Sequence, residues 1–508
     1  MSYLELLKLA APEAIVAVTA LAVLAIGLIR WGETPSSRRS SAFCSAVAGF
    51  GLAAAIGAVL TLPQRATLFG GMLVITPLTS LFKIICLALA VFTVVLARTD
   101  LSSRNRSEYL ALVLLATIGL MLLVGSEELL MIFIGLELTG LSLYVMTAFD
   151  KTDIRSAEAG LKYFLFGSTA SAFTLFGLSL IYGMAGTTGL AVIAQKLTAQ
   201  PLSPLLFAGI VMTLVGFAFK IAAAPFHLWA PDAYQGAPVP SAAFIASGSK
   251  VASFVVLGKI VLVGFGPAHG SAAWHAVIAG WAPVLAVLAA LSIVIGNLVA
   301  LAQSNVRRLL AYSAVAHAGY TLLGLIAGGR EGFSATLFYT TVYAFTLVGA
   351  FGVVALVRRE TGGDDLMNFA GLRARSPLLA GCMSIFMLSL AGLPPLAGFF
   401  GKFYLFSAAL RAGENHGLLW LVALALLGSL ISLYYYLIVL KVVFADEPAQ
   451  QETSPLRGHA APKSNVGGSI DEGGDFLQRV SLSVLGAIVI FLGVIPGPLV
   501  DRIIASLP

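Results

Sequence analysis

Residues 218–229 read AFKIAAAPFHLW, which places a lysine, a proline and a histidine inside an apolar run long enough to cross a membrane. A charge in hydrocarbon is expensive, and Pro225 lacks an amide hydrogen while its ring crowds the carbonyl of Ile221. A carbonyl freed at membrane depth is tolerated only where protein or internal water satisfies it. The stretch therefore predicts a broken helix inside a bundle.

The composition indicates a membrane protein. Of the 508 residues, 59% are apolar and only 11% are charged, whereas soluble domains have about 25% charged residues. Apolar runs of about 20 residues, the length that spans a bilayer, recur along the chain, and such continuous runs favour helices over the short alternation of a β-barrel. Because the basic residues stand singly in short loops, the net charge of +6 does not indicate nucleic-acid binding.

We predict an all-α polytopic membrane protein with 14 transmembrane helices. The expected spans are 10–30, 42–62, 78–97, 108–125, 127–148, 158–185, 203–229, 240–265, 275–302, 306–327, 333–357, 376–410, 418–444 and 476–504. The first ends in Arg30 without the cleavage site of a signal peptide, so we expect it to be retained. Residues 445–475 are polar and rich in Pro and Gly, which predicts a flexible loop.

The distribution of Lys and Arg predicts the orientation. Of 30 such residues, six lie well inside expected spans, and the other 24, in loops and at span ends, divide 18 to 6 in favour of the side reached after odd-numbered spans. Basic residues favour cytoplasmic loops. We therefore predict a multi-pass protein of the cell inner membrane with both termini outside, in the periplasm, and with loop 445–475 in the cytoplasm.

Two expected helices are interrupted, and they lie five spans apart. The seventh contains the proline described above, and the twelfth contains LAGLPPLAGFFGKFY, residues 390–404. This spacing predicts two inverted five-helix repeats, helices 4–8 in residues 108–265 and helices 9–13 in residues 275–444. Many transporters have this arrangement, with their sites at the breaks. A three-helix segment, 1–107, and a C-terminal helix in 476–508 flank the repeats.

Polar residues near the middle of spans are the candidates for function. They are Glu137, Lys220, Lys250, His317 and Lys402. The four charges among them would cost on the order of 10–14 kcal/mol in hydrocarbon, so we expect them to face the bundle interior. A lysine in an apolar interior can exchange a proton near neutral pH, because desolvation disfavours its ammonium and a nearby carboxylate favours it again. We predict a proton relay in which Glu137 controls the charge of Lys220 and His227 extends the path.

Other charged residues in the spans have structural explanations. Lys83 and Lys259 lie near span ends, and we expect their ammonium groups to extend to the interface. Glu158 and Lys162 are four residues apart, a spacing typical of an ion pair on a helix surface. For Lys162 this explanation and a role in the relay remain equally open.

Five stretches carry a resemblance to a known family. They are GLELTGLSLYVM (135–146), AEAGLKYFLFGSTASAFTLFG (157–177), FKIAAAPFHLWAPDAYQGAPVP (219–240), RRLLAYSAVAHAGY (307–320) and LAGLPPLAGFFGKFYLF (390–406). Together they resemble the antiporter-like membrane subunits of bacterial respiratory complex I, the NADH:quinone oxidoreductase. Within that family the chain is similar to the N-type branch, since YQGAPVP is typical of it and Lys402 stands where the M-type branch has glutamate.

The resemblance implies a 14-helix subunit of the membrane arm that moves protons while partner subunits oxidise NADH and reduce quinone. The family's functional positions correspond to Glu137, Lys162, Lys220, Lys250 and Lys402. By analogy, protons would reach Lys250 from the inner side, pass to Lys402 and leave outward. No cofactor or metal is expected in this chain; NADH, FMN, iron–sulfur clusters and quinone belong to partners, and K- and M-type subunits are the expected neighbours.

Two alternatives remain open. A subunit of an Mrp-type cation/proton antiporter uses the same helices and lysines, although the YQGAPVP stretch argues against it. A haem-binding redox subunit would need two facing histidines, and His227 with His317 is the pair to consider. Each of these histidines also has a structural explanation, as a core side chain bonded to a neighbouring polar group.

Overall fold

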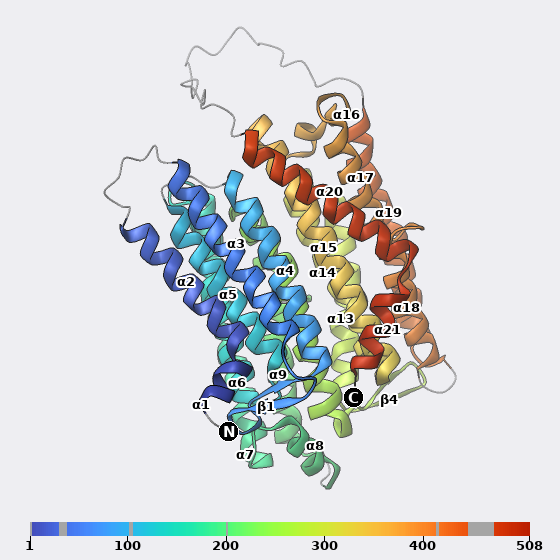
Figure 1. The fold of residues 1–508 in the computed structure, drawn as a ribbon. Helices are drawn as coiled ribbons and strands as arrows, with labels where there is room; N and C mark the ends of the chain where they lie inside the picture. Colours follow the sequence, from blue (N-terminus) through green and yellow to red (C-terminus); the bar gives the residue numbers. More distant parts are fainter. Residues whose placement is uncertain are drawn as a thin grey trace.

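The computed structural model describes residues 3–29, 38–100, 105–199, 202–412, 416–445 and 472–507. Its helices lie side by side in one bundle, and both termini lie at the same end of it (Figure 1). We call this the terminal end and the other the opposite end. The expected loop 445–475 falls almost wholly outside the described residues.

In the first half of the chain, helices lie in each expected span. The helices of this half are α1 (Tyr3–Leu9), α2 (Ala11–Ile29), α3 (Arg38–Leu60), α4 (Pro77–Asp100), α5 (Arg106–Gly125), α6 (Leu129–Thr147), α7 (Ile154–Ala185), α8 (Leu190–Ala199), α9 (Pro204–Lys220), α10 (Trp229–Gly236), α11 (Val239–Phe244) and α12 (Lys250–Gly258). The short helices α1 and α8 lie outside the expected spans. Two π-helical segments, Ile245–Ser249 and Lys259–Gly264, join and extend α11 and α12 into one span, Val239–Gly264.

The second half of the chain is also built of helices. Its helices are α13 (Trp281–Leu301), α14 (Val306–Ala327), α15 (Gly329–Thr361), α16 (Leu372–Arg375), α17 (Pro377–Ala391), α18 (Ala397–Arg411), α19 (Leu419–Phe444), α20 (Glu472–Val494) and α21 (Gly497–Ser506). The last expected span, 476–504, is divided between α20 and α21, because Pro496 cannot continue the helical hydrogen bonding.

Two short antiparallel hairpins interrupt the helical pattern. They are β1 (Ala66–Leu68) with β2 (Leu73–Ile75), and β3 (Ser271–Ala273) with β4 (Ala276–Ile278). The expected start of span 275–302 is therefore wrong, since β4 occupies 276–278 and the helix begins at Trp281. At the base of this hairpin, Gly270 (φ +70°) and Gly280 approach so closely that a Cβ on either would lie 2.5 Å from backbone atoms.

Twelve helices in the described part of the chain are long and apolar enough to cross a membrane. The two other expected spans are the interrupted ones. In 203–229 the helix α9 ends at Lys220 and α10 begins only at Trp229, whereas 376–410 is divided into α17 and α18. The prediction of a helical polytopic membrane protein with breaks at these two places is confirmed. The total of 14 helices and the inverted repeats stay predictions.

Close packing of small residues holds the centre of the bundle together. Where α13 meets α14, a Cβ on Gly296 would lie 2.5 Å from the Ala316 nitrogen, and one on Gly319 would lie 2.8 Å from the Ala289 carbonyl oxygen. Small residues at such contacts let helix backbones approach, as is common between membrane helices. The longest helix, α15, is buried along its whole apolar stretch.

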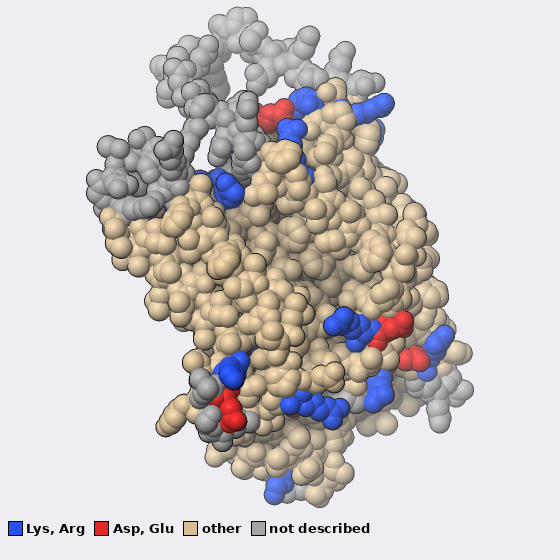
Figure 2. Space-filling model, in the orientation of Figure 1, with Lys and Arg blue, Asp and Glu red and all other residues tan. Residues whose placement is uncertain are grey.

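The charged side chains visible on the face shown in Figure 2 gather toward the two ends of the bundle. A broad band without visible charge separates them. This is the distribution that contact with hydrocarbon requires, because a charge exposed to lipid at mid-depth is costly.

Candidate functional site

The interruption of the seventh span ends α9 at Lys220, inside the protein. Side chains satisfy backbone groups that the break releases. The Ala224 N–H donates to Ser292 Oγ at 2.8 Å, and the Trp229 indole N–H donates to the Phe219 carbonyl at 3.1 Å. A cation at the carboxyl end of a helix is also favoured by the helix dipole. The local structure therefore stabilises a buried lysine at this position.

Glu137 on α6 and Lys220 on α9 line one small cavity together with Ser171 and Tyr144. The Ser171 hydroxyl donates to Glu137 Oε1 at 2.5 Å. The cavity has a volume of about 20 Å³, enough for roughly one water molecule. The structure thus brings together the carboxylate and the first lysine of the predicted relay, with a hydroxyl that orients the carboxylate.

Lys250 lies at the junction of a π-helical segment with α12 and is fully enclosed, with 2% of its surface exposed. Its Nζ donates to the Ala314 carbonyl of α14 at 2.7 Å. The same nitrogen lies 5.5 Å from the centre of the Tyr343 ring on α15, which is within the range of a cation–π contact. A π-helical segment in a helix frequently marks a functional position.

His317 lies in the middle of α14 among four tyrosines. Its Nδ1 is 2.5 Å from the Tyr339 hydroxyl, and its Nε2 is 3.0 Å from the Tyr436 hydroxyl. The ring centre of His317 lies 5.0 Å from that of Tyr343 and 5.6 Å from that of Tyr320. Both ring nitrogens therefore have hydroxyl partners, and the ring itself contacts tyrosines on either side.

Lys402 follows the break between α17 and α18, and it too is buried. Its Nζ donates to the Ala391 carbonyl, at the end of α17, at 3.0 Å and to Ser429 Oγ at 2.9 Å. It lies 5.2 Å from the centre of the Tyr320 ring. Gly392, in the break, has φ +84°, and a Cβ there would lie 2.9 Å from the Lys402 Cδ. A glycine in the break thus leaves room for the lysine stem.

These contacts form a continuous series from Lys250 to Lys402. We call its middle members, Tyr343, His317 and Tyr320, the aromatic bridge. Sequence reasoning found the lysines and the histidine but missed the tyrosines. Their only signal is a phenol in the middle of an apolar helix, where a hydroxyl needs a partner.

Lys162 lies apart from this series, near the opposite end of the bundle. It forms the expected ion pair with Glu158 at 2.6 Å and a second with Asp232 at 2.8 Å, while Asp232 also pairs with Arg308 at 2.7 Å. Partial burial alone would raise the pKa of Asp232, but its hydrogen bonds to Lys162 and Arg308 bring that pKa below its ordinary value. The network joins α7, α10 and α14.

His227 is buried in the break after α9, where its ring lies 6.2 Å from that of Tyr312. Its Nδ1 has no hydrogen-bond partner among the described residues. The structure does not bring His227 into the contacts of His317, whose two nitrogens are already engaged. This geometry disfavours a haem held between the two histidines.

The expectation for Lys83 and Lys259 is wrong. Both side chains are buried, with 3% and 4% of their surface exposed. Lys83 Nζ pairs with Glu13 at 2.6 Å, while Lys259 Nζ donates to the Val124 carbonyl at 2.9 Å and lies 3.7 Å from Glu127. The ammonium groups turn inward because α2 and the turn before α6 place carboxylates there and the end of α5 offers a carbonyl, which depth along a span alone does not reveal.

We expect Lys83→Met to destabilise the chain by about 3–5 kcal/mol, because it leaves the partly buried Glu13 carboxylate without its cation. The double variant Lys83→Met, Glu13→Gln is expected to recover most of this loss, since neither charge remains. Thermal unfolding of the protein in lipid nanodiscs measures both. Equal unfolding temperatures for Lys83→Met and the unaltered protein would contradict the assigned pair.

Within the described ranges, no group of three or more His, Cys, Asp or Glu side chains is arranged to hold a metal ion. The family model described as "NADH:quinone oxidoreductase/Mrp antiporter, TM" matches residues 126–432. This match contains Glu137, Lys162, Lys220, Lys250 and Lys402. It therefore covers both interrupted spans and the series of contacts between them.

Individual proteins are similar over nearly the whole chain. "NADH-quinone oxidoreductase subunit N 2" of Acidobacterium capsulatum is 45% identical over 97% of this chain and 98% of the relative. A chain of respiratory complex I from Thermus thermophilus, solved with bound Aureothin, is 33% identical with a TM-score of 0.76, covering 98% of this chain and 100% of that one. A chain of the Mrp complex from Dietzia sp. DQ12-45-1b has a TM-score of 0.81 at 22% identity over 98% and 97% of the two chains, which shows a shared fold alone.

Proposed function

The chain belongs to the NADH:quinone oxidoreductase/Mrp antiporter family of membrane subunits, and from this membership we propose that it is the N-type, proton-translocating subunit in the membrane arm of an NADH:quinone oxidoreductase. Partner subunits hold the redox cofactors and carry out NADH oxidation and quinone reduction. The observation that carries the proposal is the series of buried contacts from Lys250 through the aromatic bridge to Lys402.

In the proposed mechanism each lysine holds a proton as an ammonium and releases it as an amine. The Glu137 carboxylate favours the ammonium of Lys220 in their shared cavity, so a movement that separates the two releases the proton. The proton passes to Lys250, then along the hydroxyl and imidazole groups around His317 to Lys402. A hydroxyl or an imidazole can accept a proton on one side and donate one on the other, which is what a relay requires.

The remaining predictions fit this proposal. The two interrupted spans would belong to two inverted five-helix repeats in residues 108–265 and 275–444, with the series of contacts from Lys250 to Lys402 crossing from one to the other. Both termini would face the periplasm of the inner membrane, which places Lys162, Asp232 and Arg308 on the cytoplasmic side. K- and M-type subunits would be the neighbours in the membrane arm.

An Mrp-type antiporter subunit is the second candidate, and it is less well supported. The curated relatives that are 38–45% identical carry NADH-quinone or NAD(P)H-quinone oxidoreductase names, whereas the likeness to the Mrp complex is one of fold alone. Proton pumping that persists when sodium is replaced by choline would favour the oxidoreductase subunit.

The variant Glu137→Gln tests the proposal in the assembled complex in sealed vesicles. The amide oxygen still accepts from Ser171, so the variant removes only the charge. We expect NADH-driven proton uptake, followed with a pH-sensitive dye, to fall by about tenfold, since the Lys220 ammonium loses the one charged neighbour that favours it in the cavity.

The matched control is Glu331→Gln. Glu331 is 70% exposed and forms only a loose pair with Arg411 at 3.6 Å, so its removal should leave pumping unchanged. Proton uptake by Glu137→Gln at the rate of this control would refute the role of the carboxylate.

A further inference from the structure

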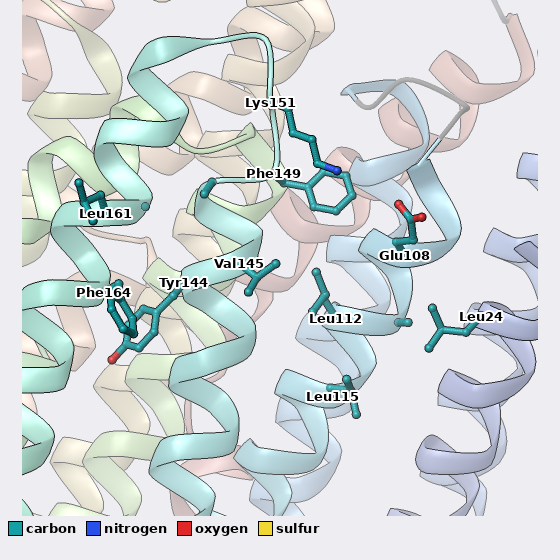
Figure 3. Close-up of a pocket in the computed structure, with 13 residues that line it drawn as sticks. Leu24, Glu108, Leu112, Leu115, Tyr144, Val145, Phe149, Lys151, Leu161 and Phe164 are labelled. Atoms are coloured by element: carbon teal, nitrogen blue, oxygen red, sulfur yellow. The ribbon is translucent and has the colours of Figure 1, made fainter. Parts of the chain in front are cut away.

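A deep apolar groove lies on the side of the bundle, separate from the series of buried charges. It has a volume of about 590 Å³ and lies between α2, α5, α6 and α7. Figure 3 shows Leu24, Leu112 and Val145 directed into it. Leu115 lies at the end of the groove away from Glu108 and Lys151. Nearly all the atoms that line it are apolar, so it suits a hydrocarbon chain and not a polar substrate.

The groove is open toward the region that the bilayer occupies. Val145, Leu161 and Phe164 form part of its wall and are 52%, 58% and 43% exposed. Along α5 the wall runs from Glu108 to Leu115, a rise of seven residue steps and thus about 10 Å of helix. A molecule within the membrane can therefore enter sideways and extend from the surface into the hydrocarbon layer.

Two opposite charges stand at the mouth of the groove. Glu108 lies in the first turn of α5, and Lys151 lies in the turn between α6 and α7 (Figure 3). In the described part of the chain, neither side chain forms a salt bridge. An anion near Lys151 and a cation near Glu108 would satisfy both.

We propose that this groove is a binding site for a membrane phospholipid with a phosphoethanolamine headgroup, one of whose acyl chains lies in the groove. The phosphate pairs with Lys151, and the primary ammonium donates to Glu108. A purely anionic headgroup would meet the Glu108 carboxylate without a compensating cation. The arrangement therefore selects a headgroup that carries both charges.

The groove also borders the cavity of Glu137 and Lys220, and this part of the inference rests on the proposed function. Tyr144 lines both the groove and the cavity of Glu137 and Lys220. Its hydroxyl and the Lys220 Nζ both lie beside Gly140. A Cβ placed on Gly140 would be 3.2 Å from the hydroxyl and 3.4 Å from the Nζ. An acyl chain packed over the outer side of this ring would cover the cavity and exclude water on that side.

Photolabelling of the purified complex in nanodiscs tests the lipid site without turnover. The probe is a phosphatidylethanolamine with a diazirine on one acyl chain, and mass spectrometry locates the labelled peptides. We expect labels on residues 108–115 and 141–149, competed by unlabelled phosphatidylethanolamine and not by phosphatidylglycerol. Equal competition by the two lipids, or no label in these peptides, would overturn the proposal.

Val145→Trp fills the groove, and Leu141→Trp is its matched control. Leu141 is on the same helix, is 53% exposed and does not line the groove. We expect labelling to fall by about tenfold in Val145→Trp, since the ring takes the volume of the acyl chain, and to stay unchanged in Leu141→Trp. Lys151→Gln and Glu108→Gln should each lower it by about fivefold through loss of a charge-assisted hydrogen bond.

Two further outcomes separate this inference from the proposed function. Cross-links from the groove to a partner polypeptide, in place of lipid labels, would show that a protein covers it and would overturn the lipid site. Loss of label in Val145→Trp with unchanged proton uptake would overturn the sealing role of the lipid, while the role of the Glu137 carboxylate in the relay is tested separately by Glu137→Gln.

Discussion

Lys250→Met is expected to lower NADH-driven proton uptake by at least about 100-fold, the usual contribution of a positioned acid or base to proton transfer. Methionine has a similar volume to the lysine stem, so the core packing around this position should survive. The ammonium, however, is the group that lies over Tyr343 and donates to Ala314. Its loss removes the first proton carrier of the series to Lys402.

Lys250→Arg separates proton transfer from charge alone. Arginine keeps the positive charge but cannot release its proton in a protein, so this variant should also fail to pump. Lys196→Met, on the exposed surface of α8, serves as the control. Assembly is checked by the subunit composition of the purified complex. Normal pumping by Lys250→Arg would mean that Lys250 acts as a fixed charge and not as a carrier.

The sequence predicted the helical architecture because membrane spans are determined locally. A lipid-facing backbone must satisfy its own hydrogen bonds, so an apolar run of sufficient length predicts a helix. The breaks were predictable for the same reason, since Pro225 and the pair Pro394 and Pro395 remove hydrogen bonds from the helix. Mid-span charges such as Lys250 and Lys402 were predictable as buried, because exposure to lipid would be too costly.

The features that sequence reasoning mispredicted or missed depend on which helices pack against each other. Lys83 and Lys259 lie near span ends, where an ammonium can normally reach water, yet α2 and the turn before α6 offer them buried partners. The aromatic bridge was equally hidden, because Tyr343 and Tyr320 come from different helices and a tyrosine in an apolar helix is usually core. Which buried charges form ion pairs, and which aromatic rings contact each other, is determined by the tertiary packing of the helices.

His317→Phe is the second variant with a large expected effect. Phenylalanine keeps a ring among Tyr320, Tyr339 and Tyr343, so packing changes little, but it offers neither nitrogen to the hydroxyls of Tyr339 and Tyr436. We expect proton uptake to fall by about 100-fold, since the imidazole is the one group of the bridge with both a donor and an acceptor nitrogen. Quinone reduction uncoupled from pumping is measured in parallel.

His416→Phe, at an exposed histidine, is the control and should pump normally. The combination of His317→Phe with Lys250→Met gives the sharper test, because groups that act in one path are strongly non-additive. If the proton must pass both, the double variant should be no slower than the slower single variant. Independent, multiplying losses would instead place His317 and Lys250 on separate paths, and normal pumping by His317→Phe would reduce the aromatic bridge to a packing contact between α14 and α15.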